Sequence, residues 1–467
     1  MTKDEVRAAA DRLVDFHDRF APLFGKEEAQ DHGYNYVKGL MVCPERKSIE
    51  PIALNVGDGK VSAMQKFINI APWDHGDVQA EVQTVFAEEL VPSAAGSPIG
   101  VVGIVDESGF TKKGNQSAGV ARQHNGRLGK EDNCQVGVFL VGVTPDGAAL
   151  LDHGLYLPEE TWCEDTQECR ERRDKVHIPE RVVFQTKPQI AAGLIRLTAV
   201  LGVVALDWIT ADEEYGRNGE FLDELETLRH RYVVEVPVNT TVWTEDPATC
   251  VPPQGSRGRV PTLPSRASVR SVAAVASALP AESWRTLRVR QGAKGPLCFE
   301  FTAVRVWAVR HGAAGPPIWL LVRRSLEATP EIKYYVSNGD AATPLEVLAQ
   351  VACTRHEIEE YFEDGKSYLG MAQYETRSWI GWHHHMSLVG MAHLFITLTR
   401  RDLKKNAGAD ARPDRAVASA SNEGTRAHTG AGPSPGGLPH PSQRDRPAVA
   451  HQDLDGQARE RQDPPAV

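Results

Sequence analysis

A stretch of acidic and basic residues at positions 355–366 contains the clearest pattern that could carry out chemistry. If the stretch forms a helix, Arg355, Glu359 and Lys366 stand at positions i, i+4 and i+11, with one carboxylate between two cations along a single face. Such a face could hold an anionic group beside a metal ion. The alternative is a solvated helix with ordinary i, i+4 ion pairs, and on this stretch alone that alternative is favoured.

Two aspartates stand where predicted strands end. The apolar run 101–105 has the pattern of a buried strand and is followed by Asp106, and the run 203–210 is followed closely by Asp212. Asp207 is an alternative to Asp212. Since it lies inside the apolar run, where its side chain would meet a neighbouring strand, we favour Asp212.

The ends of neighbouring strands meet at one edge of a sheet, so Asp106, Asp212 and a Glu359 from a covering helix could form one cluster of carboxylates. Glu107 beside Asp106 points to the other face and is predicted to be structural. Three carboxylates repel one another unless a divalent cation neutralises them, and oxygen ligands favour Mg²⁺ or Mn²⁺. Two such ions can clamp the attacking and leaving oxygens of a phosphoryl displacement. The pattern therefore predicts phosphodiester cleavage and transfer.

Three consecutive histidines, His383, His384 and His385, offer a second metal hypothesis. Consecutive side chains on a helix point in three different directions, so they cannot all bind one ion. A packed or solvated role is therefore favoured for them over a metal site.

The distribution of charge points to a polyanion. The chain has a formal net charge of −10, yet residues 255–325 carry twelve basic and only two acidic side chains. A smaller basic island between residues 111 and 130 contains Lys112, Lys113 and Arg122. Two basic surfaces on an acidic protein predict a localised groove for DNA, although a solvated face remains the alternative for each surface alone.

The length and composition indicate an ordinary globular protein. The chain has 467 residues, of which 41% are hydrophobic and 24% charged, and no stretch is apolar enough for a signal peptide or a membrane span. Its seven cysteines include no Cys-x-x-Cys pair, which predicts free thiols in a reducing compartment rather than a zinc module. We expect a cytoplasmic protein.

Changes in pattern along the chain predict five segments. Residues 1–95 have helical apolar spacing, and residues 96–245 read as strands followed by alternating helices and strands, an α/β core in which three antiparallel strands precede the first crossover. Residues 246–330 are predicted to be a basic, β-rich insertion, and residues 331–405 the helical C-terminal part of the core. The composition of residues 406–467 predicts a disordered tail.

These residues resemble the DDE transposases of bacterial insertion sequences, in the IS-four-like superfamily and the branch with a Tyr-x2-Arg-x3-Glu-x6-Lys signature. The motifs that carry the resemblance are Asp106-Glu107-Ser108-Gly109-Phe110-Thr111-Lys112-Lys113-Gly114, Asn133-Cys134-Gln135, Ala211-Asp212-Glu213-Glu214-Tyr215-Gly216, and Arg355, Glu359 and Lys366 at the signature spacing. One position departs from the signature: its tyrosine is replaced by Ala352, which puts one phosphate or stacking contact in doubt.

The resemblance implies an RNase H-like catalytic core with an N-terminal helical domain and a β-rich insertion. It implies that Asp106, Asp212 and Glu359 are catalytic ligands of two Mg²⁺ or Mn²⁺ ions, and that Arg355 and Lys366 contact DNA phosphates. The activity expected is metal-dependent cleavage at insertion-sequence ends and strand transfer into target DNA, by at least a homodimer on double-stranded DNA at the nucleoid. The alternatives are a catalytically inactive DNA-binding regulator and an RNase H-like nuclease.

Overall fold

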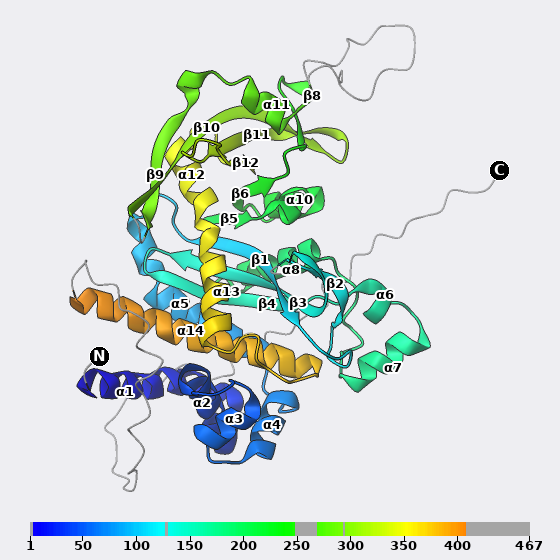
Figure 1. Cartoon of the computed structure of the whole chain (residues 1–467), viewed down its shortest axis with the longest axis vertical. Coiled ribbons are helices and arrows are strands. Elements are labelled where there is room, and N and C mark those ends of the chain that lie inside the picture. The colour runs from blue at the N-terminus through cyan, green and yellow to red at the C-terminus, as the bar shows by residue number, and fades with distance from the viewer. Residues whose placement is uncertain (1–2, 127–128, 248–268, 293–294, 408–467) are drawn as a thin grey trace, which may run out of the picture.

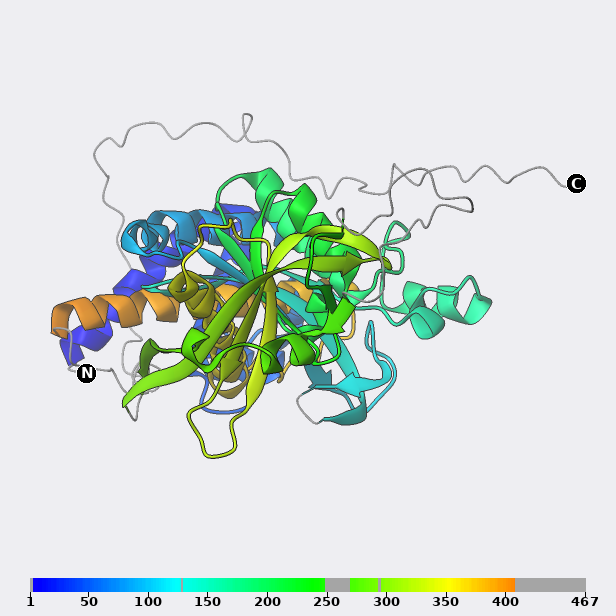
Figure 2. The same cartoon turned by 90° about the horizontal axis from the view of Figure 1, so that it is seen from above.

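The computed structural model describes residues 3–126, 129–247, 269–292 and 295–407. A mixed β-sheet of twelve strands runs through the described part of the chain, with helices packed against it (Figures 1 and 2). The predicted α/β class is confirmed. The predicted disordered tail lies, from residue 408 onward, outside the described residues.

The first part of the chain is helical, as its apolar spacing predicts. Five α-helices precede the first strand: α1 (Lys3–Phe20), α2 (Glu27–Val42), α3 (Ile49–Asn55), α4 (Val61–Asn69) and α5 (His75–Glu89). In α1 the apolar face buries Leu13, Phe16 and Phe20. Helices α1 to α4 gather at one end of the molecule beside the long helix α14 (Trp379–Ala407) (Figure 1). A domain boundary at residue 95 stays a prediction.

Antiparallel strands open the sheet: β1 (Val102–Thr111), β2 (Ala121–Asn125), β3 (Lys130–Thr144) and β4 (Gly147–Leu155). The long strand β3 pairs with each of the other three. Its turn into β4 uses Gly147 at φ 145°, a conformation that residues with a side chain rarely adopt. Gln79 and Gln83 of α5 donate hydrogen bonds of 2.5 and 3.0 Å to main-chain oxygens of β4, which satisfies part of the backbone of this strand.

A crossover then adds two parallel strands. Three helices lie between β4 and the next strand: α6 (Glu159–Trp162), α7 (Gln167–Lys175) and α8 (Lys187–Leu201). Thr186 and Gln189 form a capping box that starts α8. Strand β5 (Trp208–Ala211) pairs in parallel with β1. After α9 (Glu213–Gly216) and α10 (Gly219–Thr227), β6 (Arg231–Val236) pairs in parallel with β5.

The described part of residues 246–330 is largely β structure. It contains β8 (Val269–Ser271), α11 (Val272–Ser277), β9 (Arg285–Gly292), β10 (Gly295–Arg310) and β11 (Ala313–Arg324). Strand β7 (Thr241–Trp243) precedes this segment and β12 (Ile332–Ser337) follows it. Since β12 pairs with both β11 and β6, these strands extend the same sheet. Four of its basic residues lie outside the described residues: Arg257, Arg259, Arg266 and Lys294.

Three C-terminal helices cover the sheet. Helix α12 (Leu345–Thr354) leads into α13 (His356–Tyr368), which packs across β1, and α14 packs against β4 (Figure 1). Helix α8 packs on the opposite face, since Gly154 of β4 faces Ile190 whereas the neighbouring His153 faces α14. The cluster of buried residues is continuous from α1 to α14.

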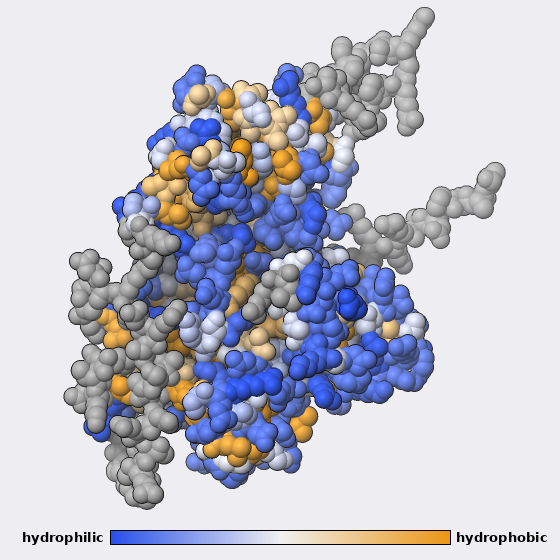
Figure 3. Space-filling model, in the orientation of Figure 1, coloured by the Kyte–Doolittle hydropathy of each residue, from blue (hydrophilic) through white to orange (hydrophobic). Residues whose placement is uncertain are grey.

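The surface is mostly polar on the face that α13 crosses. Hydrophilic residues cover the middle of this face, and apolar residues collect above it, over the basic strands, and below it, over α3 and α4 (Figure 3). Leu54, Ile70, Leu297 and Leu326 are among the exposed apolar side chains. None of the helices in the described ranges is both long enough and apolar enough to cross a membrane.

Candidate active site

Asp106 lies in the middle of β1, not at its end. The strand continues for five residues beyond it because β3 pairs with β1 from Val102 to Thr111. The carboxylate of Asp106 is mostly buried, with a side chain 15% exposed, and its Oδ1 accepts the backbone N–H of Glu107 at 2.8 Å. The apolar run therefore ends where the residues of β1 become polar, and the strand itself continues.

Asp212 follows β5 directly, where the sequence places it. It caps the short helix α9, with its Oδ1 accepting the N–H of Glu214 at 2.9 Å. The last parallel pair of β1 and β5 joins Val105 to Ala211, so Asp106 and Asp212 occupy the next position on adjacent strands. Adjacent strands lie about 4.8 Å apart, which brings the two aspartates together.

Asp207, the alternative to Asp212, has a structural contact instead. Its Oδ2 accepts the backbone N–H of Val101 at 2.8 Å, and its Oδ1 lies 3.8 Å from the guanidinium of Arg231. These contacts join the residue before β5 to the segment that precedes β1 and to the first residue of β6. The strand itself begins at Trp208, later than the apolar run suggests.

Arg355 connects Asp106 with Glu359. It stands between α12 and α13, and its guanidinium lies 3.2 Å from Oδ2 of Asp106 and 2.5 Å from Oε1 of Glu359. The Arg355 side chain is 19% exposed, whereas that of Glu359 is 47% exposed and also contacts His356 at 3.0 Å. The predicted i, i+4 ion pair between Arg355 and Glu359 is present. Arg355 also contacts Asp106 and so connects this pair to β1.

The aspartates are in an electrostatically unfavourable place for ionised carboxylates. Burial raises the pKa of Asp106 well above its ordinary value, and the negative charges of Asp212 and Glu107 raise it further, whereas Arg355 lowers it. Burial also raises the pKa of Asp212 to about 6, with the charge of Glu107 as the next cause. A cation placed between them would offset both the desolvation and the repulsion.

The donor atoms fit Mg²⁺ or Mn²⁺, which prefer carboxylate oxygen. Asp106 and Asp212 would supply the first ligands, and Glu359 would join them from α13. Within the described residues the three carboxylates do not form a group whose ligand atoms all lie within 4.8 Å of one another. Arg355 occupies the space between Asp106 and Glu359, so it is the present counter-charge of the site.

Glu107 lies in a layer behind the aspartates together with Tyr215 and Lys187, two residues to which the sequence analysis gave no role. The carboxylate of Glu107 accepts hydrogen bonds from the Tyr215 hydroxyl at 2.9 Å and the Lys187 ammonium at 2.7 Å. Glu107 thus has the structural contacts predicted for it, but its charge also acts on both aspartates. A usable signal was the position of Tyr215, one helical turn after Asp212.

The five cations predicted to contact DNA divide into two groups. Lys113 and Arg122 are exposed on the surface. Lys112 lies 3.4 Å from the ring centroid of Tyr374, and Lys366 donates to the main-chain oxygen of Gly109 at 3.2 Å. Arg355 is held by the carboxylates. In this structure the second group is therefore directed into the protein.

The three consecutive histidines point in different directions, as a helix requires. His384 lies 2.9 Å from the main-chain oxygens of both Ile68 and Trp73, and His385 lies 2.9 Å from the hydroxyl of Tyr36. His383 faces a different set of residues. No single ion can therefore be bound by this run of three residues.

Ala352, which replaces the tyrosine of the signature, is a core residue. It is 3% exposed in α12 and belongs to the continuous hydrophobic core. Tyr361, the nearest following tyrosine, is also buried, with its ring 4.4 Å from that of His393. Neither position presents an aromatic ring to solvent beside Arg355.

Comparison with known proteins gives a family. The model of the DDE superfamily endonuclease family matches residues 19–296, more than half of the chain. The match includes Asp106 and Asp212, and Glu359 lies beyond it. The chain is also similar to a probable transposase for insertion sequence element IS701 from Microchaete diplosiphon, with 31% identity over 196 residues. That alignment covers 42% of this chain and 46% of the relative, less than half of each.

Proposed function

The chain belongs to the DDE superfamily of endonucleases, and from this premise we propose that it is a transposase that cuts DNA at the ends of an insertion sequence and joins them to target DNA. The observation that carries the proposal is that Asp106 and Asp212 each follow the last residue pair of the adjacent parallel strands β1 and β5, with Arg355 linking Asp106 to Glu359. The similarity to a probable insertion-sequence transposase supports the choice of substrate.

The fold proposed for the catalytic part is RNase H-like. The strand order β4-β3-β1-β5-β6, with an antiparallel first half and two parallel strands after a crossover, supports this. The contact between Arg355 and Glu359 supports the proposed membership of the branch with the Tyr-x2-Arg-x3-Glu-x6-Lys signature.

In the proposed mechanism Asp106, Asp212 and Glu359 are the metal ligands. Two Mg²⁺ or Mn²⁺ ions bound there would supply the positive charge that activates the attacking oxygen and stabilises the leaving oxygen of the phosphodiester. The chain itself holds these carboxylates in place: β1 and β5 fix the aspartates, α13 carries the glutamate, and Tyr215 and Lys187 hold Glu107 behind them.

The cations position DNA in this proposal. Lys113 and Arg122 bind the phosphates of double-stranded DNA from the surface, and Arg355 turns from Asp106 toward a phosphate when the DNA enters. Lys112 and Lys366 support the strand that carries Asp106, with Lys366 joined to Gly109 on β1. Because both ends of an element must be held together, two copies of the chain are proposed to assemble on the DNA.

Cleavage of end-containing DNA tests the proposal. Duplexes that carry the ends of the element surrounding the coding region are incubated with the full chain and Mg²⁺. We expect a cut at the element boundary, and no cut with Asp212→Asn or Glu359→Gln. Glu363→Gln is the matched control, because it changes another carboxylate on α13 that is exposed and has no contact assigned at the site.

Each other outcome favours a different function. Cutting without preference for the ends indicates an RNase H-like nuclease. Specific binding without any metal-dependent cut indicates an inactive DNA-binding regulator. Cutting that survives both substitutions removes the carboxylates from the mechanism.

A further inference from the structure

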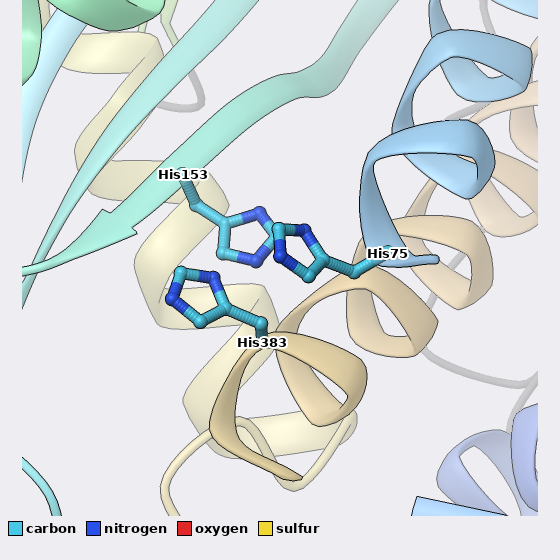
Figure 4. A group of neighbouring side chains, drawn as sticks. All are labelled: His75, His153 and His383. Atoms are coloured by element: carbon cyan, nitrogen blue, oxygen red, sulfur yellow. The ribbon is translucent and has the colours of Figure 1, made fainter. Parts of the chain in front are cut away.

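A second cluster of possible metal ligands lies away from the carboxylates. His75 at the start of α5, His153 on β4 and His383 on α14 turn their imidazole rings toward one another (Figure 4). A nitrogen of each ring lies within 4.8 Å of a nitrogen of the other two. In the described part of the chain, no other group of three or more histidine, cysteine or acidic side chains has its ligand atoms this close together.

We propose that His75, His153 and His383 bind one borderline transition-metal ion, Zn²⁺ by preference, and that this ion fastens α5 and α14 to β4. Three imidazoles are suitable ligands for Zn²⁺ and unsuitable ones for Mg²⁺. Three ligands leave a fourth position for water. His75, which is half-buried, gives that position access to solvent, whereas His153 and His383 are buried.

Binding one ion requires the three nitrogens to lie closer together than they do now. Tetrahedral Zn²⁺ with nitrogen ligands at 2.0–2.1 Å places those nitrogens about 3.3 Å apart. The rings of His75 and His383 are now stacked with centroids 4.4 Å apart, and that of His153 lies 5.3 Å from His383. In the proposed site the rings turn about the broad torsion next to the imidazole, which moves the nitrogens from separations of at most 4.8 Å toward this value.

Aromatic side chains surround the three imidazoles. The ring of Trp382 lies 5.5 Å from His153 and that of Trp379 4.7 Å from His383, so aromatic surfaces enclose the cluster. Such a shell excludes water from two of the ligands and holds their rings in position. The two helices and the strand that supply the ligands are far apart in sequence, so one ion joins elements that the chain does not join locally.

The cluster is also close to Asp106. The strand pairs place His153 opposite Phe139, and Phe139 opposite Asp106, in one row across β4, β3 and β1. Directly paired residues point to the same face, so the backbone positions of His153 and Asp106 lie about 10 Å apart there. The Phe139 ring stacks at 6.5 Å with His153 and meets Phe362 of α13 at 5.3 Å. The ion would therefore stabilise the row that carries Asp106 without binding to it.

Metal binding by the purified full chain tests this proposal independently of DNA cleavage. The protein is stripped with a chelator and titrated with Co²⁺ in excess Mg²⁺, which occupies oxygen donors but not imidazoles. We expect one equivalent of Co²⁺ with the visible absorption of a tetrahedral site, displaced by Zn²⁺. Zn²⁺ should raise the melting temperature by roughly 3 °C or more, and Mg²⁺ should not.

The variants identify the ligands. His75→Ala removes the least buried ring, so it is the variant expected to fold, and it should weaken Co²⁺ binding at least about tenfold. His153→Asn and His383→Asn should do the same where they fold. His124→Ala, an exposed histidine on β2, is the control and should bind one equivalent. Equal binding by His75→Ala and the wild-type chain, or no Co²⁺ binding at all, overturns the proposal and leaves three packed histidines.

Discussion

The carboxylate site and the histidine cluster lie on the same face of the sheet, and they differ in the properties that select a ligand. At the first, oxygen donors from β1 and β5 stand beside an arginine, and Glu359 is half exposed. At the second, nitrogen donors from α5, β4 and α14 meet in an aromatic enclosure. We therefore propose different ions for the two sites, because the donor atoms and the neighbouring charges of a site decide which ion it prefers.

Substitution of the aspartates should have the largest effect. Asp106→Asn and Asp212→Asn keep the shape of the side chain but remove a ligand charge, so DNA cleavage should fall at least about 10³-fold. Folding should be retained, because the charges of these groups are unfavourably buried. Co²⁺ titration of the same variants should still show one equivalent in the histidine cluster. Loss of both properties together would show that the two sites are not separate.

Removal of metal ions should affect a different property at each site: DNA cleavage at the carboxylates and thermal stability at the histidine cluster. A chelator should stop cleavage and lower the melting temperature. Mg²⁺ should restore cleavage alone, and Zn²⁺ should restore the melting temperature alone, because oxygen and imidazole donors prefer different ions. The comparison between the sites is wrong if one ion restores both measurements.

Substitution of Arg355 tests whether its positive charge competes with a metal ion at the carboxylates. Because its guanidinium lies between Asp106 and Glu359, it competes with a metal ion in the protein without DNA. We expect Arg355→Gln to bind Mn²⁺ several-fold more tightly than the wild-type chain, measured by the loss of the free-ion electron paramagnetic resonance signal. Cleavage should nevertheless be slower, since the arginine no longer positions the phosphate. Unchanged or weaker Mn²⁺ binding contradicts the competition.

Two neighbouring lysines provide a smaller test on the DNA side. Lys113 is exposed, so Lys113→Ala should reduce DNA affinity and lower the slope of affinity against salt by about one. Lys112 is directed onto Tyr374, and burial lowers its pKa to about 7. Lys112→Met should therefore leave the salt slope unchanged. An equal change of slope in both variants would place Lys112 on the DNA as well.

His393 is a buried histidine on α14, and no metal role is proposed for it. Burial lowers its pKa to about 4, with Asp364 and Arg400 as the charged neighbours and the Tyr361 ring against it. Between pH 6.5 and 4 the unfolded chain takes up a proton that the folded His393 does not, so its contribution to stability falls as the pH falls, by on the order of 1–3 kcal/mol. Urea unfolding at pH 7 and 4.5 should show a smaller loss for His393→Phe than for the wild-type chain.

Local patterns predicted the parts of the molecule that local physics determines. The position of Asp212 after a short apolar strand and the ion pair of Arg355 with Glu359 follow from apolar runs and helical spacing. The end of β1 was predicted too early, at Asp106, since pairing with β3 keeps polar residues in the strand. That pairing is a long-range property which the run of apolar residues does not contain.

The histidine cluster shows the limit more clearly. His75, His153 and His383 belong to three elements, and no spacing along the chain relates them. The conspicuous run at 383–385 directed attention to adjacent residues, whereas the partners of His383 come from the start of α5 and from an edge strand. The packing of α5 and α14 against β4 and against each other brings them together.

Iron-mediated backbone cleavage tests the central claim most directly, namely that Asp106, Asp212 and Glu359 bind divalent ions. Fe²⁺ replaces Mg²⁺ at oxygen ligands, and ascorbate with peroxide then cuts the chain near the bound ion. We predict cuts close to residues 106, 212 and 359 that excess Mg²⁺ suppresses. The absence of Mg²⁺-sensitive cuts at 106 and 212 would contradict the account.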